Sequence, residues 1–242
     1  MAELAGRVIG GLRRSPLPPG AMSGDEELIY RALCFVLREA ARGSDPLKVM
    51  VPVSECLECT QLYDDVAHAV AGLLRVPEMG HVIELNSPTA PVLRALPEDY
   101  RGRVHMCTDV VPIFDILNHY LMMGALKGVD PVRAGLSEAA SRIGAPLGAV
   151  VAASPINWVH LDPLHLASRA YAMLEPGGWL IEVYPLRKSP SKPSPLEPVL
   201  AALGVEEVYD LGYVKGFLMS EGYRDVDHSE VGPLFILRAR KP

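Results

Sequence analysis

The chain alternates short apolar runs with amphipathic segments over most of its length. Apolar runs of strand length predict buried strands at 48–53, 81–85, 103–107, 148–153 and 179–184. Between them, apolar residues recur at helical spacing, most clearly over 61–74. Strands that alternate with helices indicate a mainly parallel sheet with right-handed crossovers.

Two later segments have a different pattern. The segment 112–142 predicts two helical patches that are separated by Gly124, Gly128 and Pro131. Near the C-terminus, strands are expected at 223–229 and 234–240 with only a short turn between them. This spacing predicts a hairpin-like pair at one side of the sheet.

The N-terminal part differs from the rest in composition. Residues 1–24 combine a weak helix with a Pro/Gly-rich linker or arm, and Ser23 or Asp25 can cap the helix that follows. The predicted organisation is an N-terminal arm and helical extension (1–46) followed by one sheet-forming domain (47–242).

The segment Leu174–Tyr184 combines the end of an amphipathic run, a Pro-Gly-Gly turn and a buried strand. Pro176 ends the helix, and the two glycines permit positive φ angles and close backbone approach. This stretch resembles the turn before the fifth strand of class I S-adenosylmethionine-dependent methyltransferases, which typically reads Leu-Lys-Pro-Gly-Gly. The resemblance covers the chain from about Leu47 onward. It implies a three-layer α/β/α sandwich with a seven-stranded, mostly parallel, doubly wound sheet and an antiparallel last strand.

The resemblance also implies that S-adenosylmethionine binds at the carboxyl ends of the strands. Glu84 matches the family's acid that binds the ribose hydroxyls, and Asp109 matches the carboxylate that meets the adenine amino group. Each has a simpler interpretation, because Glu84 could be an exposed strand-end charge and Asp109 a helix N-cap. The cofactor-binding set implied in this way is Val53, Ser54, Cys56, Glu58, Glu84, Asp109 and Ala153.

The loop after the predicted first strand departs from the family pattern. The family places glycines there, because only glycine lets the backbone approach the methionine moiety closely. The segment Ser54–Cys59 has no glycine, and Glu55 and Glu58 would repel the ligand's own carboxylate. In an alternative register Val82–Thr89 is the first strand and loop, but it also lacks glycine and leaves the sheet one strand short.

Cys56 and Cys59 form a lone Cys-x-x-Cys pair. A zinc site would need two further ligands, and a redox dithiol at a helix N-terminus is a second alternative. We prefer the simpler interpretation, which is two half-buried thiols or a disulfide, and expect no metal. The further zinc ligands would have to come from Cys34, Cys107, His68 or His105.

The segment 154–160 follows the predicted fourth strand, where the family places the substrate. Ser154 or Asn157 would hold a polar acceptor, and Trp158 would stack on a planar substrate. His160 would act as general base, which makes Asn157 and His160 the candidate catalytic residues. The Asn-Pro-Pro-aromatic signature of enzymes that methylate amide or exocyclic nitrogens is absent. The alternative is a helix-entry loop with Trp158 in the core. The remaining histidines considered, His119, His165 and His228, are expected to be surface or core residues.

Composition narrows the functional classes. The 242 residues are 49% hydrophobic and 21% charged, which fits a compact globular protein. The net charge of −6 argues against unaided binding to nucleic acid, a local basic patch aside. One glutamine, three asparagines and 22 prolines suggest a thermophile, although a GC-rich genome gives a similar bias. No apolar run reaches membrane-spanning length and no signal peptide is evident, so a cytoplasmic protein without a membrane partner is expected.

Two functional hypotheses follow. The first is a cytoplasmic S-adenosylmethionine-dependent methyltransferase, a transferase whose acceptor is an unidentified small molecule or macromolecule. The second is a degenerate methyltransferase-fold protein that has lost cofactor binding and serves as a binding or scaffold subunit, in a homo- or hetero-oligomer. The glycine-free loop motivates the second hypothesis.

Overall fold

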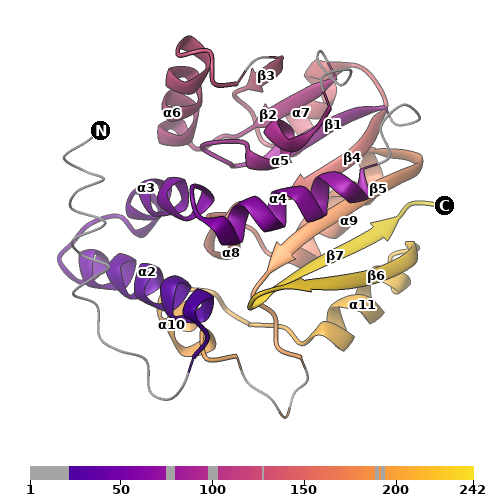
Figure 1. Cartoon of the computed structure of the whole chain (residues 1–242). Coiled ribbons are helices and arrows are strands. Elements are labelled where there is room, and N and C mark those ends of the chain that lie inside the picture. Colours follow the sequence, from indigo (N-terminus) through magenta and orange to yellow (C-terminus); the bar gives the residue numbers. More distant parts are fainter. Residues whose placement is uncertain (1–21, 75–79, 98–102, 127, 189–190, 192–193) are drawn as a thin grey trace.

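The computed structural model describes residues 22–74, 80–97, 103–126, 128–188, 191 and 194–242 (Figure 1). Within these residues, seven strands form one sheet in the order β3-β2-β1-β4-β5-β7-β6. The strands are β1 His81–Leu85, β2 Val104–Cys107, β3 Val129–Val132, β4 Leu147–Ala152, β5 Leu174–Tyr184, β6 Arg224–Val231 and β7 Leu234–Arg240.

The first five strands pair in parallel, and β7 is antiparallel to both β5 and β6. Helices cover both faces: α4 lies in front of the sheet in Figure 1 and contacts α5, whereas α9 lies behind it between α7 and α11. This arrangement confirms the predicted fold class. The helices are α2 Gly24–Ala41, α3 Pro46–Glu58, α4 Gln61–Leu73, α5 Pro91–Ala95, α6 Val111–Met122, α7 Leu136–Ile143, α8 Asn157–His160, α9 Pro163–Met173, α10 Glu197–Ala202 and α11 Leu211–Ser220.

The prediction of a strand at 48–53 is wrong, because these residues lie in helix α3. The Asp45 side chain accepts a hydrogen bond from the Leu47 amide, and Pro46 occupies the first turn, where a proline is well tolerated. A short, continuous apolar run does not distinguish a buried strand from a buried helix. Here α3 packs against α2, α4 and α6, which supports the helix.

Because 48–53 is a helix, the seventh strand of the sheet is supplied by β3, which lies at the break expected between the two helical patches of 112–142. It contains Pro131, which removes one backbone donor. Because β3 is at the edge of the sheet, that donor is not needed for a second neighbour. The first strand of the sheet is therefore 81–85, and the alternative register Val82–Thr89 is the correct one. It does not leave the sheet short, because β3 supplies the strand.

The other expectations for the sheet are confirmed. The Pro-Gly-Gly segment forms an irregular start of β5, since Leu174 pairs with Leu147 and Trp179 with Ala149. Gly177 has a φ of 84°, and a Cβ on Gly178 would lie 3.0 Å from the Leu147 carbonyl oxygen. Both glycines are therefore required where they stand.

The N-terminal helix and the tail also agree with the sequence. Ser23 caps α2 in a capping box with Glu26, and β6 and β7 form the expected pair. The proposed domain boundary falls at the start of α3, which contacts α2, and it remains a prediction. The predicted arm at 1–24 lies almost wholly outside the described residues. No described helix has the length and apolar character needed to cross a membrane.

Candidate functional site

Three segments meet at the carboxyl ends of the central strands. Because β1, β2 and β4 are parallel neighbours, the loop 86–90, Asp109 and the segment 154–160 share one edge of the sheet. Figure 1 shows α3 and α8 at this end. The Tyr120 hydroxyl of α6 donates to Glu55 Oε1 of α3 over 2.8 Å, which ties α3 to the same edge.

Glu58, at the end of α3, closes the loop after β1. Its side chain is fully buried, and Oε2 accepts hydrogen bonds from Ser87 Oγ (2.9 Å), the Thr89 amide (3.0 Å) and Thr89 Oγ1 (2.7 Å). Ser87 and Thr89 are buried as well. The donors that this loop would offer to a ligand's carboxylate are thus already bound to a carboxyl group of the chain itself.

Glu84 is a second buried carboxyl group beside this cluster. Its Oε2 accepts a hydrogen bond from the Leu93 amide over 3.1 Å, and Oε1 has no partner in the described part of the chain. Burial raises the pKa of Glu58 to about 7, although the Ser154 side chain, Thr89 and Ser87 favour its charged form. Burial, and then the charge of Glu58, raise the pKa of Glu84 to about 8. The interpretation of Glu84 as an exposed strand-end charge is therefore wrong.

The loop after β1 has a glycine-like backbone without containing glycine. Asn86 and Ala90 have φ angles of 54° and 47°, in the left-handed region that glycine adopts most easily. Asparagine tolerates this region, whereas alanine is strained there. The Asn86 side chain donates to Asn157 Oδ1 over 3.0 Å, and Asn157 donates to the Leu85 carbonyl over 3.0 Å. Asn157, a candidate catalytic residue, therefore holds the loop in place.

The residues predicted to form the first cofactor loop lie on α3 instead. Val53 and Ser54 are buried within the helix, and Cys56 is half-buried near its end. As a loop cradling the methionine moiety, this assignment is wrong, because these residues precede α4 rather than follow a strand. Glu58 contacts the loop after β1, but its carboxyl group accepts that loop's hydrogen bonds and does not form part of a cofactor-binding loop.

The cysteines are free thiols. Burial, and then nearby carboxylates, raise the pKa of the Cys56 and Cys59 thiols, so neither is activated as a thiolate. Over the residues that the structure describes, no group of three or more His, Cys, Asp or Glu side chains is arranged to hold a metal ion. His105, one of the potential zinc ligands, is hydrogen-bonded through Nδ1 to Asp130 Oδ2 over 2.9 Å and through Nε2 to His81 Nδ1 over 2.7 Å.

Asp109 and His160 form the open part of this edge. His160 Nε2 lies 3.5 Å from Asp109 Oδ1, and the two side chains are 26% and 61% exposed. Asp109 does not cap α6, whose N-cap is Val110. A Cβ on Gly135, after β3, would lie 3.5 Å from Asp109 Oδ2, so three strand ends converge here. An accessible histidine next to a carboxylate can bind a ligand or move a proton.

The remaining predicted residues of the fourth strand end are in the core. Ala153 and Ser154 are fully buried, and the Ser154 side chain lies beside the Glu58 carboxyl group, whose charged form it favours. Trp158 is 3% exposed, and its indole nitrogen donates to the Val183 carbonyl over 2.9 Å. The alternative interpretation of Trp158 as a core residue is thus the one that the structure supports.

A pocket of about 250 Å³ lies beside His160, at the carboxyl ends of β4 and β5. Its walls come from α8, the start of α9, the end of β5 and the segment after α10. The sequence reasoning missed most of it. A usable signal was the position of Tyr184, which is the last residue of a strand whose carboxyl end faces the site. Four missed lining residues are Tyr184, Glu206, Glu207 and Tyr209.

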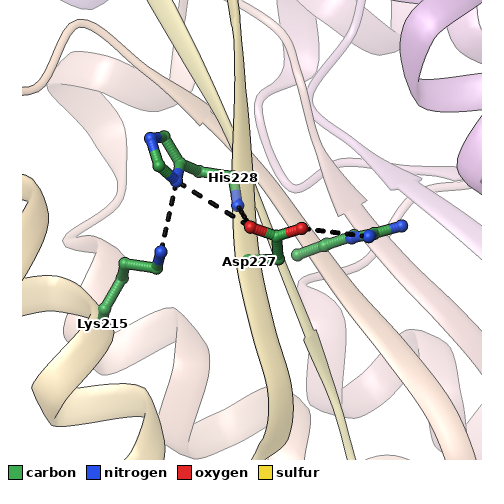
Figure 2. Close-up of polar contacts among 4 residues, drawn as sticks. Lys215, Asp227 and His228 are labelled. Atoms are coloured by element: carbon green, nitrogen blue, oxygen red, sulfur yellow. Dashed lines mark hydrogen bonds and ion pairs between the residues drawn. The ribbon is translucent and has the colours of Figure 1, made fainter.

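Of the three histidines expected to be surface or core residues, His228 lies on β6 and not at this edge. Figure 2 shows His228 on β6, where Nδ1 lies 3.2 Å from Lys215 Nζ of α11. Asp227 accepts a hydrogen bond from the His228 amide over 2.8 Å and pairs with Arg238 over 3.1 Å. This is a partly exposed charge network across β6 and β7, consistent with the expectation for His228.

Solved structures share this fold. The CurJ carbon methyltransferase matches with a TM-score of 0.63 and 11% identity, over 89% of this chain and 66% of that one. The mitomycin 7-O-methyltransferase MmcR matches with a TM-score of 0.62 and 12% identity, over 99% and 67%. Human N-acetylserotonin methyltransferase, in complex with S-adenosylmethionine, matches with a TM-score of 0.56 and 14% identity, over 98% and 66%.

These likenesses establish the class I methyltransferase-like fold of the chain. The chain spans about two thirds of the length of these proteins. No protein-family model matches its sequence, and neither does any curated protein. At 11 to 14% identity the likeness concerns the fold, and the activity has to be argued from the site.

Proposed function

We propose that this chain is a binding protein built on the methyltransferase fold, in which Glu58 closes the loop that would hold S-adenosylmethionine. The observation that carries the proposal is the set of three hydrogen bonds from Ser87 and Thr89 to Glu58 Oε2. They satisfy the donors of the loop from within the chain, and the loop itself is buried.

The chemistry of the donor set also argues against the cofactor at this loop. The methionine moiety of S-adenosylmethionine carries a carboxylate, and its approach to the loop would place it near Glu58 and Glu84. When ionised, these groups repel another carboxylate, and displacing Glu58 would leave Ser87 and Thr89 without their partner. The residues present therefore do not fit the cofactor in this place.

Methyl transfer is the second candidate, and a specific observation favours it. Asp109 and His160 are accessible and close together, and Asp109 follows β2 at the edge where the resemblance places the cofactor. On this hypothesis α3 would have to move before the cofactor binds. The acceptor and any partner or oligomeric state would then still have to be found.

Isothermal titration with S-adenosylmethionine and S-adenosylhomocysteine separates the two candidates. Titration of the wild-type protein is expected to give no heat with S-adenosylhomocysteine up to high micromolar concentration. The Asp109→Asn variant serves as the matched control, because it alters the open edge without touching the Glu58 cluster. Heat with either compound that falls in Asp109→Asn would overturn the proposal in favour of the methyltransferase.

A further inference from the structure

We propose that the pocket at the carboxyl ends of β4 and β5 binds a small organic cation with an ammonium group. This inference rests on the proposed binding function, because it names the ligand class of such a protein. The pocket is lined by other residues than the loop after β1. The two proposals can therefore fail separately.

The charged side chains of the pocket are acidic. Asp162, Glu206 and Glu207 line it, and none of its lining residues is lysine or arginine. No ion pair joins these three carboxylates to any described residue. Asp162 is held in position, since Oδ1 accepts from the His165 amide over 2.8 Å and Oδ2 from the Tyr209 hydroxyl over 3.0 Å. Carboxylates without a cationic partner, one of them held in place, favour a cationic ligand.

Aromatic rings form much of the remaining wall. Trp158, Tyr184 and Tyr209 line the pocket. The hydrogen bond from Trp158 to the Val183 carbonyl fixes its ring, and the Tyr209 ring stacks on Tyr213 with centroids 5.6 Å apart. Aromatic faces attract organic cations, most strongly where water is excluded. Rings and carboxylates together suit an ammonium group better than a neutral polar ligand.

Tyr184 supplies an independent indication of a ligand. It lines the pocket and is 4% exposed, yet its hydroxyl has no hydrogen-bond partner among the described residues. Glu182, two residues earlier on β5, is fully buried, and both of its carboxyl oxygens lack partners in the described part of the chain. Buried polar groups are normally paired. The Tyr184 oxygen is itself inaccessible to solvent, so its pairing with the N–H groups of a bound ammonium requires the side chain to turn toward the pocket.

The size of the pocket limits the ligand. Its volume is about 250 Å³, below the range of roughly 300 to 1,000 Å³ that is usual for drug-sized ligands. The ligand class is therefore a compact protonated amine, which carries the N–H groups that Tyr184 would accept. His160 lies at the border between this pocket and Asp109, so a bound cation would sit beside the open edge of the site.

Titration with matched cations and neutral analogues tests the inference. The protonated amines n-butylamine and putrescine are the probes, and 1-butanol and 1,4-butanediol are their neutral counterparts. We expect the full chain to bind at least one cation with a Kd in the millimolar range or below, and more weakly at higher salt. Equal binding of a cation and its neutral analogue would overturn the proposal, and so would the absence of binding by either cation up to about 10 mM.

Two variants locate the binding site. Exchange of both rim carboxylates, Glu206→Gln with Glu207→Gln, is expected to weaken cation binding about tenfold at low salt. The control exchanges two exposed aspartates of α4, Asp64→Asn with Asp65→Asn. It changes the net charge equally and is expected to leave binding unchanged. Equal loss in both double variants would mean a nonspecific charge effect and would contradict the site.

Tyr184→Phe provides a second measurement that does not depend on net charge. It removes only the unpaired hydroxyl, so the fold is expected to persist, as a circular dichroism melt can check. Cation binding is expected to weaken severalfold. An unchanged Kd would contradict the role of Tyr184. S-adenosylmethionine is itself a cation, so heat that falls in the Glu206/Glu207 variant but persists in Asp109→Asn would support the pocket and leave the closed loop intact.

Discussion

Along the carboxyl edge of the sheet, the acidic side chains are buried at the end of β1 and line a pocket at the ends of β4 and β5. At the end of β1, Glu58 and Glu84 are fully buried and fill the space next to their loop. At the ends of β4 and β5, Asp162, Glu206 and Glu207 line an open pocket. The same fold therefore has one region closed by its own side chains and one region open to a ligand.

The difference lies in desolvation. Removing a carboxyl group from water disfavours its charged form, and the pKa values of Glu58 and Glu84 are raised accordingly. The pKa of the exposed Asp227 is shifted in the opposite direction. Hydrogen bonds from the His228 amide and Arg238 lower the pKa of Asp227. Buried acids therefore make the stability of the folded protein depend on pH, whereas an exposed acid such as Asp227 stays in contact with water.

The largest expected effect is the pH dependence that the closed region imposes on stability. Glu58 and Glu84 have folded pKa values of about 7 and about 8, above the ordinary value of 4.5. Between pH 4.5 and pH 8 the folded state therefore holds more protons than the unfolded state, and stability falls as pH rises. We expect the free energy of unfolding, measured by urea denaturation, to fall by several kcal/mol over this range.

The double variant Glu58→Gln with Glu84→Gln tests the origin of this slope. Glutamine keeps the shape and does not titrate, so the slope is expected to become clearly smaller. A residual slope is expected, because burial also raises the pKa of Glu182 well above its ordinary value. An unchanged slope would show that the two glutamates at β1 do not set the pH dependence.

The order of elements from β4 onward was predictable from the sequence. Strands β4 to β7 lie close to their predicted positions, because long apolar runs, the Pro-Gly-Gly turn at 176–178 and the short turn at Gly232 are local signals. The elements before β4 were harder to predict. Residues 48–53 are as apolar as a strand, and β3 is short and contains Pro131, so local pattern assigned both to the wrong class.

The site was less predictable than the fold, since its character depends on contacts between distant segments. Glu58 was expected near the cofactor from its place in a loop, but it lies on a helix and bonds to residues about 30 positions later. Tyr184 and Tyr209 come from different elements and meet only in the folded chain. Asp109 and His160 were identified singly, and their proximity of 3.5 Å was not.

The glycine-like backbone of the closed loop gives a smaller, opposite effect on stability. Ala90 has a φ of 47° and a ψ of 54°, which is strained for alanine. We expect Ala90→Gly to raise the free energy of unfolding by about 0.5 to 1 kcal/mol, because relief of this strain outweighs the lost methyl group and the added chain entropy. Urea denaturation at constant pH measures it.

The same exchange at Ala95 is the control for Ala90→Gly. Ala95 is the last residue of helix α5, where glycine is expected to lower stability by up to about 1 kcal/mol. Destabilisation by both exchanges would mean that Ala90 is not strained. Stabilisation at Ala90 alone would show that the loop after β1 keeps a backbone conformation that favours glycine although it contains no glycine.

The smallest expected effect belongs to an exposed acid, which serves as the reference for the buried ones. Asp227 lies in the network of Figure 2 and is 56% exposed. Because its folded pKa is lowered, its contribution is present above its ordinary pKa and is lost as pH falls, the reverse of Glu58. We expect Asp227→Asn to lower the free energy of unfolding at pH 7 by about 0.5 kcal/mol or less, and by still less in 1 M salt. A loss as large as that caused by titrating Glu58 and Glu84 would remove the distinction between buried and exposed acids, since water would then not be screening the pair between Asp227 and Arg238.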